Sequence, residues 1–121
     1  MKTILIIEDE EHIANAEKII LKDEFKVFIA ETGTAGLSMA SKIRPDVILL
    51  DIMLPHMSGY EVCQKLRDDK NLSNTKIIMV TSKSEQADED IGMDLDADDY
   101  IMKPFEPDEL LHVIEQALKK K

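Results

Sequence analysis

The sequence is poor in cysteine, in aromatic residues and in positive charge. Cys63 is the only cysteine, which excludes an internal disulfide framework and fits a reducing, cytoplasmic compartment. No apolar run approaches the roughly 20 residues that a membrane span needs, and the start of the chain shows no cleavage site of a signal peptide. The chain carries 25 acidic and 15 basic residues, a net charge of -10. We therefore expect no direct binding to nucleic acid and a preference for cations and basic partner surfaces.

The chain is long enough for one domain with a real core, and we expect that domain to span residues 1–121. Apolar runs typical of buried strands alternate with amphipathic helical patterns. The expected strands are residues 4–7, 26–30, 47–51, 76–80 and 98–101, and the helices between and after them start near residues 11, 32, 58, 84 and 107. Strict alternation predicts a parallel sheet with helices on both faces.

Several helix boundaries have a local cause. Thr32 is suited to cap the second helix, which ends before Pro45 because a residue preceding proline disfavours the helical conformation. Ser58 and Glu61 have the spacing of a capping box at the third helix. Pro107 suits the first position of the last helix.

The side of each helix that faces the core follows from its apolar residues. In the first helix we expect the buried face to hold Ile13, Ala16, Ile19 and Ile20. Cys63 lies beside the apolar stripe of the third helix and is interpreted as a small buried side chain. Residues 71–75 are interpreted as a polar loop.

Polar side chains follow four of the expected strands. Glu8 and Asp9 follow the first strand, Asp51 ends the third, Thr81 follows the fourth, and Lys103 lies just past the fifth. The carboxyl ends of parallel strands meet at one edge of a sheet, so these side chains should converge. Three carboxylates and one lysine make a negative pocket that needs a cation, and Mg²⁺ is the natural candidate because it prefers oxygen ligands.

Each of these residues also has an ordinary structural interpretation. Asp51 could terminate a strand, and Glu8 with Asp9 could stabilise the N-terminus of the first helix. Thr81 could precede a helix cap, and Lys103 could be a solvated loop residue. Each structural interpretation is plausible for one residue alone. It is far less plausible that polar residues follow four strands at the same sheet edge by coincidence.

These residues lie in segments that resemble the receiver domain of two-component response regulators, and the resemblance covers essentially the whole chain. Any one segment would be weak evidence for this family, but the segments together are specific to it. They are Ile6-Ile7-Glu8-Asp9-Glu10, residues 45–55 from Pro45 to Pro55, Met57-Ser58-Gly59, Thr81-Ser82, and residues 97–105 from Ala97 to Phe105. The resemblance implies a flavodoxin-like α/β fold, a doubly wound (βα)5 arrangement with a five-stranded parallel sheet in the order 2-1-3-4-5.

The resemblance also implies roles for the residues at the strand ends. Asp51 would be the phosphoacceptor. Glu8, Asp9 and Asp51 would bind Mg²⁺, together with the backbone carbonyl of Met53.

Thr81 and Lys103 would contact the phosphoryl oxygens. Tyr100 would be the aromatic switch residue that turns inward when Thr81 moves, a role that is compatible with a plain core aromatic. The Lys103–Pro104 peptide bond would be cis.

The function that follows is a phosphorylation-controlled signalling switch. The phosphodonor would be a sensor histidine kinase or a phosphotransfer protein, and the domain would catalyse only its own phosphorylation and dephosphorylation. A phosphohydrolase with an aspartyl nucleophile is an alternative, but such enzymes commonly need a carboxylate where this chain has Met53. A flavin-binding electron carrier would need a phosphate-cradling loop after the first strand, and that loop is acidic.

The chain departs from the family pattern where many receivers read Ala-Gly-Ala-Asp-Asp. Here residues 95–99 read Leu-Asp-Ala-Asp-Asp, and aspartate tolerates a left-handed helix end better than most residues. This departure affects the expected local geometry of the face that would change on phosphorylation, and not the expected fold. The weakly apolar, acidic helix expected at residues 84–95 should form the output face with Tyr100 and bind a downstream protein with a basic surface.

The last helix carries no arginine, whereas receivers joined to winged-helix domains usually carry arginines there for dimer contacts. We therefore expect a monomer in the unphosphorylated state. Both a stand-alone regulator and a fragment of a longer one remain open. His12, His56 and His112 are interpreted as surface or loop residues without metal-ligand spacing.

Overall fold

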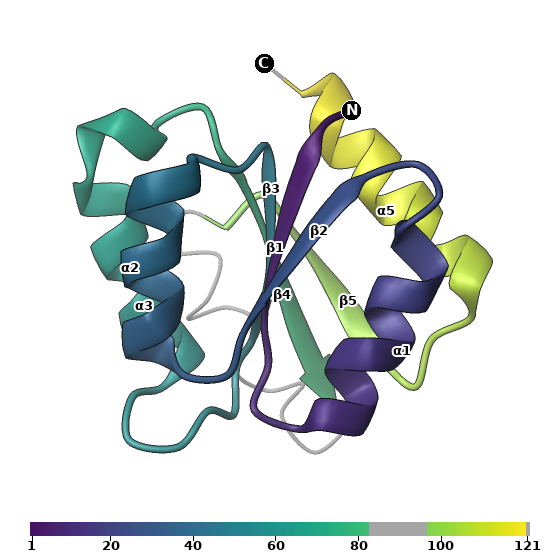
Figure 1. Cartoon of the computed structure of the whole chain (residues 1–121), viewed down its shortest axis with the longest axis horizontal. Helices are drawn as coiled ribbons and strands as arrows, with labels where there is room; N and C mark the ends of the chain where they lie inside the picture. Colours follow the sequence, from purple (N-terminus) through teal and green to yellow (C-terminus); the bar gives the residue numbers. More distant parts are fainter. Residues whose placement is uncertain (83–96, 121) are drawn as a thin grey trace.

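The computed structural model describes residues 1–82 and 97–120 of the chain, which fold into a central sheet with helices on both faces (Figure 1). The strands are β1 Thr3–Ile7, β2 Lys26–Ala30, β3 Val47–Asp51, β4 Lys76–Ser82 and β5 Asp99–Lys103. The helices are α1 Glu11–Leu21, α2 Gly33–Ile43, α3 Gly59–Asp68 and α5 Pro107–Lys119, with a short 3-10 helix at Lys70–Leu72. The helix predicted at residues 84–95 lies outside the described residues.

All described strand pairs are parallel, and the order β2-β1-β3-β4-β5 confirms the predicted flavodoxin-like topology. The register places Asp51 opposite Val80 and Ser82 opposite Lys103. The carboxyl ends of β3, β4 and β5 are therefore brought to one edge of the sheet, at the end of the molecule away from the N-terminus (Figure 1).

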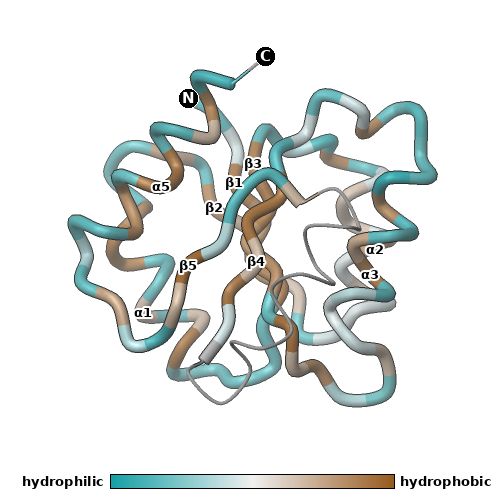
Figure 2. Tube along the Cα trace, turned by 180° about the vertical axis from the view of Figure 1, so that it is seen from behind, coloured by the Kyte–Doolittle hydropathy of each residue, from teal (hydrophilic) through white to brown (hydrophobic). Residues whose placement is uncertain are grey.

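Two apolar layers hold the helices to the sheet. On one face, Leu5, Ile48 and Leu50 pack in one cluster with residues of α2 and α3, and on the other face Ile4, Ile6 and Leu49 pack with residues of α1 and α5. The alternation of side chains along each strand sends successive residues to opposite layers. Figure 2 shows the resulting pattern, with hydrophobic segments in the central strands and hydrophilic segments at the periphery. Among the described helices, none combines the length and the apolar character needed to cross a membrane.

Most predicted boundaries are confirmed. The Thr32 hydroxyl oxygen accepts a hydrogen bond from Ala35 N at 3.0 Å, and the Ser58 hydroxyl oxygen accepts one from Glu61 N at 3.2 Å. Helix α5 begins at Pro107 as predicted. Its full capping box, formed by Glu106 and Glu109, was not predicted, although it has the same i, i+3 spacing.

Three predictions about local structure were wrong. Strand β5 starts one residue later than predicted and continues to Lys103, because pairing with β4 extends to Ser82. The segment 71–75 is not a plain loop, because Leu72 is buried at the end of the 3-10 helix. These ends are set by pairing and burial across the fold rather than by local sequence.

The third error concerns the face of α1. Its buried residues are Ala14, Glu17 and Leu21, whereas Ile19 is 65% exposed. The predicted face was rotated relative to the buried one, because the apolar pattern favoured Ile19. The core instead takes Glu17, which is only 2% exposed.

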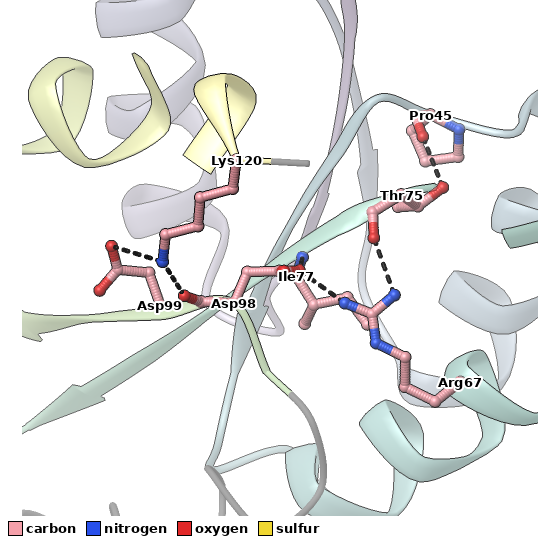
Figure 3. A network of polar contacts seen from close by, with 7 residues as sticks. All are labelled: Pro45, Arg67, Thr75, Ile77, Asp98, Asp99 and Lys120. Atoms are coloured by element: carbon pink, nitrogen blue, oxygen red, sulfur yellow. Dashed lines mark hydrogen bonds and ion pairs between the residues drawn. The ribbon is translucent and has the colours of Figure 1, made fainter. Parts of the chain in front are cut away.

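A polar network ties the starts of β4 and β5 to α3 and to the residue just past α5 (Figure 3). Arg67 of α3 donates hydrogen bonds to the carbonyl oxygen of Thr75 at 2.8 Å and to the Asp98 carboxylate at 2.5 Å. The same carboxylate oxygen accepts a hydrogen bond from Ile77 N at 2.8 Å. Lys120, just past α5, donates to the carbonyl oxygen of Asp98 at 2.5 Å. The network therefore fixes the start of β5.

Candidate functional site

Three carboxylates meet where β1 and β3 end. Glu8, Asp9 and Asp51 each offer an oxygen, and these oxygens lie within 4.8 Å of one another. Glu8 is 2% exposed and Asp51 6% exposed, whereas Asp9 is open to solvent. The structure thus brings together three of the residues singled out from the sequence, two of them buried and one accessible.

Lys103 reaches the buried pair from the end of β5. Its Nζ lies 3.1 Å from Glu8 Oε1 and 3.4 Å from Asp51 Oδ2. Burial works against the ammonium charge, but the Asp51 and Glu8 carboxylates outweigh it, so the pKa of Lys103 is raised and the side chain stays charged. One cation consequently serves two buried carboxylates.

One lysine does not neutralise this site. Burial, a hydrogen bond with Asp51 and the charge of Asp51 together raise the pKa of Glu8 to about 7. The backbone N–H of Glu10, which donates to Glu8 at 3.2 Å, and the charge of Lys103 offset only part of that rise. Such crowding of negative charge is the environment in which a further cation binds favourably.

The loop after β3 holds Asp51 in place. Met53 N donates a hydrogen bond of 3.0 Å to Asp51 Oδ1, and Gly59 N donates one of 2.8 Å to the carbonyl oxygen of Ile52. A Cβ at Gly59 would lie 2.7 Å from Ile52 Cα and would also overlap the Asp51 carbonyl. Glycine is therefore required where α3 begins, because the helix lies directly against the strand end that carries Asp51.

The other predicted site residues surround this centre. Thr81, 1% exposed, lies in β4 one residue past the position that pairs with Asp51. The Met53 side chain is 63% exposed, and its backbone belongs to the loop that follows Asp51. Tyr100 is partly buried against the α2–α3 layer, and the Lys103–Pro104 peptide bond is cis. The histidines behave as predicted, since His12, His56 and His112 are exposed.

Sequence reasoning missed one titratable residue near the site. Glu17 is buried in α1, and its Oε2 has no hydrogen-bond partner among the described residues. Burial and the charge of Glu8 raise its pKa to about 8, against the opposing effect of Lys103. The only sign in the sequence that Glu17 is buried is its helical spacing with Ala14 and Leu21. An acidic side chain at such a position is not expected to be buried.

The chain has relatives among known proteins. The model of the response regulator receiver domain matches residues 4–115. The chain belongs to this family. The receiver domain therefore belongs to two-component signalling, as its motifs indicated, and not to a class of metabolic enzymes.

Relatives of the receiver domain include longer regulators. The DNA-binding response regulator MtrA of Mycobacterium tuberculosis is 40% identical over 118 residues, which are 97% of this chain and 50% of that protein. The response regulator ArlR of Staphylococcus haemolyticus is 41% identical over 121 residues, 99% of this chain and 54% of that protein. The chain thus spans about half the length of these curated relatives.

A solved structure shows the same fold over nearly its entire length. The receiver domain of the sensor histidine kinase PA1611 from Pseudomonas aeruginosa has a TM-score of 0.90 and 26% identity, covering 98% of both chains. That structure has a magnesium ion coordinated in its active site cleft. In the present chain, the set of three carboxylate oxygens has the hard donor chemistry that suits the same ion.

Proposed function

We propose that this receiver domain is a phosphorylation-controlled switch that accepts a phosphoryl group on Asp51. The observation that carries the proposal is the convergence of Glu8, Asp9, Asp51 and Lys103 at one sheet edge. The phosphodonor is a sensor histidine kinase or a phosphotransfer protein. The domain catalyses its own phosphorylation and dephosphorylation and is not an enzyme for another substrate.

The chemistry needs a positioned nucleophile and a positive environment. An Asp51 carboxylate oxygen forms a bond to phosphorus as the bond to the donor's nitrogen breaks, which leaves an aspartyl phosphate and a free donor imidazole. Met53 N and Lys103 Nζ hold the two carboxylate oxygens, so the nucleophile is oriented before the donor arrives. After transfer, the ammonium group of Lys103 pairs with one phosphoryl oxygen, and the Thr81 hydroxyl donates a hydrogen bond to another.

Magnesium is the cofactor that the donor set fits. Glu8, Asp9 and Asp51, with the Met53 carbonyl, would hold it. When bound, Mg²⁺ neutralises charge that develops on the transferred group.

The output side of the proposal involves Tyr100. This residue turns inward when Thr81 moves toward the phosphoryl group, and the altered face then binds a downstream protein with a basic surface. The partner-facing helix predicted at residues 84–95 belongs to the same proposal and lies outside the described residues. Direct nucleic-acid binding is not proposed for this domain, although relatives are named as DNA-binding regulators.

Acetyl phosphate with Mg²⁺ should add one phosphoryl group to the domain, detectable by intact-mass spectrometry. Asp51→Asn should abolish the adduct, because it removes the nucleophile. Asp68→Asn, an exposed acid on α3, is the matched control and should retain the adduct. An adduct of normal yield in Asp51→Asn would place the phosphoacceptor elsewhere.

A further inference from the structure

A cavity of about 660 Å³ lies beside the carboxylate centre, between α1 and the segment that connects β5 to α5. Its walls are apolar side chains from both elements. The lining consists of His12, Ile13, Ala16, Glu17 and Ile20 from α1, and Lys103, Pro104, Phe105 and Pro107 from the other side. A cavity of this size and character is typical of small-molecule sites.

Among the polar residues of this lining, Glu17 differs in being buried with an unsatisfied oxygen. Its side chain is almost fully buried, and Oε2 has no hydrogen-bond partner among the residues that the structure describes. A buried acceptor without a donor destabilises the protein, so a ligand that brings a hydrogen-bond donor into the cavity binds favourably to Glu17. The last torsion of a glutamate is broad, so the carboxyl can turn toward such a donor without any movement of α1.

The protein does not supply the missing donor itself. Lys103 also lines the cavity, but its Nζ is held by Glu8 and Asp51 at 3.1 and 3.4 Å. The charged groups that act on Glu17 are Glu8, Asp51 and Lys103, and two of these three are acidic. His12 stands exposed on the cavity lining. The local balance of charge therefore favours a cation.

We propose that this cavity binds a small organic cation, with an apolar body against the α1 and Phe105 walls and an amine that donates to Glu17. The site is separate from the carboxylate cluster, although the charges of Glu8, Asp51 and Lys103 act on Glu17. The inference needs no phosphoryl group, because the cavity and the unpartnered Glu17 oxygen are present in the unphosphorylated domain. Its ligand class is an alkyl or aryl amine rather than a neutral molecule of the same shape.

The test compares phenylbutylamine with phenylbutanol, which share a skeleton and differ in charge. Both are titrated at pH 8.5, above the pKa of about 8 of Glu17, into unphosphorylated, magnesium-free protein. Binding is followed through the NMR amide shifts of α1 and residues 105–106. We expect saturable shifts confined to these segments, with the amine bound about tenfold more tightly than the alcohol, equivalent to about 1.4 kcal/mol.

Two variants separate the amine contact from the cavity. Glu17→Gln should reduce the tenfold preference to within about twofold, whereas Glu11→Gln, an exposed acid on α1, should keep it. Ala16→Phe should fill the cavity and abolish binding of both probes. The inference is overturned if the wild type shows no saturable shifts or no preference for the amine, or if both Glu17→Gln and Ala16→Phe bind as the wild type does.

Discussion

At the scale of single residues, the carboxylates of this domain differ in exposure, and exposure decides what each can do. Asp9 is open to solvent and can exchange ligands freely, whereas Glu8 and Asp51 are buried beside Lys103. Glu17 is buried without a partner for one of its oxygens. The same functional group is therefore solvent-accessible at Asp9, part of a charge cluster at Glu8 and Asp51, and buried with a raised pKa at Glu17.

Gly59→Ala should lower both stability and phosphorylation. The added methyl group would overlap the Asp51 carbonyl and lie 2.7 Å from Ile52 Cα, so α3 or the loop must shift. Overpacking of this kind costs about 1–3 kcal/mol, which chemical denaturation can measure. The rate of Asp51 phosphorylation by acetyl phosphate should fall as well, because the nucleophile's loop moves. Gln64→Ala, on the exposed side of the same helix, should change neither quantity.

Glu17 should make the domain less stable as pH rises through neutrality. Burial raises its pKa from 4.5 to about 8, so between these values the folded state binds a proton that the unfolded state has released. The contribution is fully present below pH 4.5 and is lost as pH rises toward 8, by about 1.4 kcal/mol for each unit in that interval. Glu17→Gln should flatten this slope in urea denaturation series, and Glu11→Gln should not. A slope unchanged in Glu17→Gln would mean that the residue is ionised in the folded protein.

Among the elements, the start of β5 depends on contacts with segments that are distant in the sequence. Arg67 and Asp98 are 31 residues apart, and the bond between them connects α3 to the start of β5 (Figure 3). Asp98 also satisfies Ile77 N at the start of β4, and Lys120 binds its carbonyl. Strands that lack a hairpin connection are thus aligned by side chains as well as by their backbone ladder.

Asp98→Ala should destabilise the fold by about 2 kcal/mol, because it leaves Ile77 N and the Arg67 guanidinium without this acceptor. Asp68→Ala, the exposed neighbour of Arg67 on α3, should have little effect. Urea denaturation followed by circular dichroism compares the two. Equal stabilities would show that water replaces the carboxylate at no cost.

At the scale of the whole molecule, a net charge of -10 is concentrated in part at one sheet edge, so cation binding should be coupled to folding. Mg²⁺ that binds only the folded state stabilises it by mass action, by about 2.7 kcal/mol at 100 times the dissociation constant.

The melting temperature should therefore rise with added Mg²⁺. Asp9→Ala should remove most of this rise, because it deletes the accessible ligand of the cluster. Asp23→Ala, an exposed acid in the turn after α1, should preserve it. Differential scanning calorimetry at constant ionic strength makes the comparison. A full Mg²⁺ effect in Asp9→Ala would place the ion outside the cluster.

The features with local causes could be predicted from the sequence. Strand β3 is a continuous apolar run that ends in Asp51, and parallel strands bring their carboxyl ends together, so the meeting of Asp51 with Glu8 and Lys103 was predictable. Ser58 and Thr32 cap their helices through neighbours three residues away. Such features depend on period, capping and strand order, all of which are written along the chain.

The buried face of α1 could not be predicted in this way, because it depends on which elements pack against the helix. Ile19 has the more apolar side chain, yet it is exposed and Glu17 is buried, because Ala14 and Leu21 on the same face as Glu17 pack with the sheet and α5. The bond from Arg67 to Asp98 and the contact of Gly59 with the Asp51 strand end likewise join segments that no local pattern relates. Their positions follow from shape and distance in the folded chain, where a residue's neighbours in space replace its neighbours in sequence.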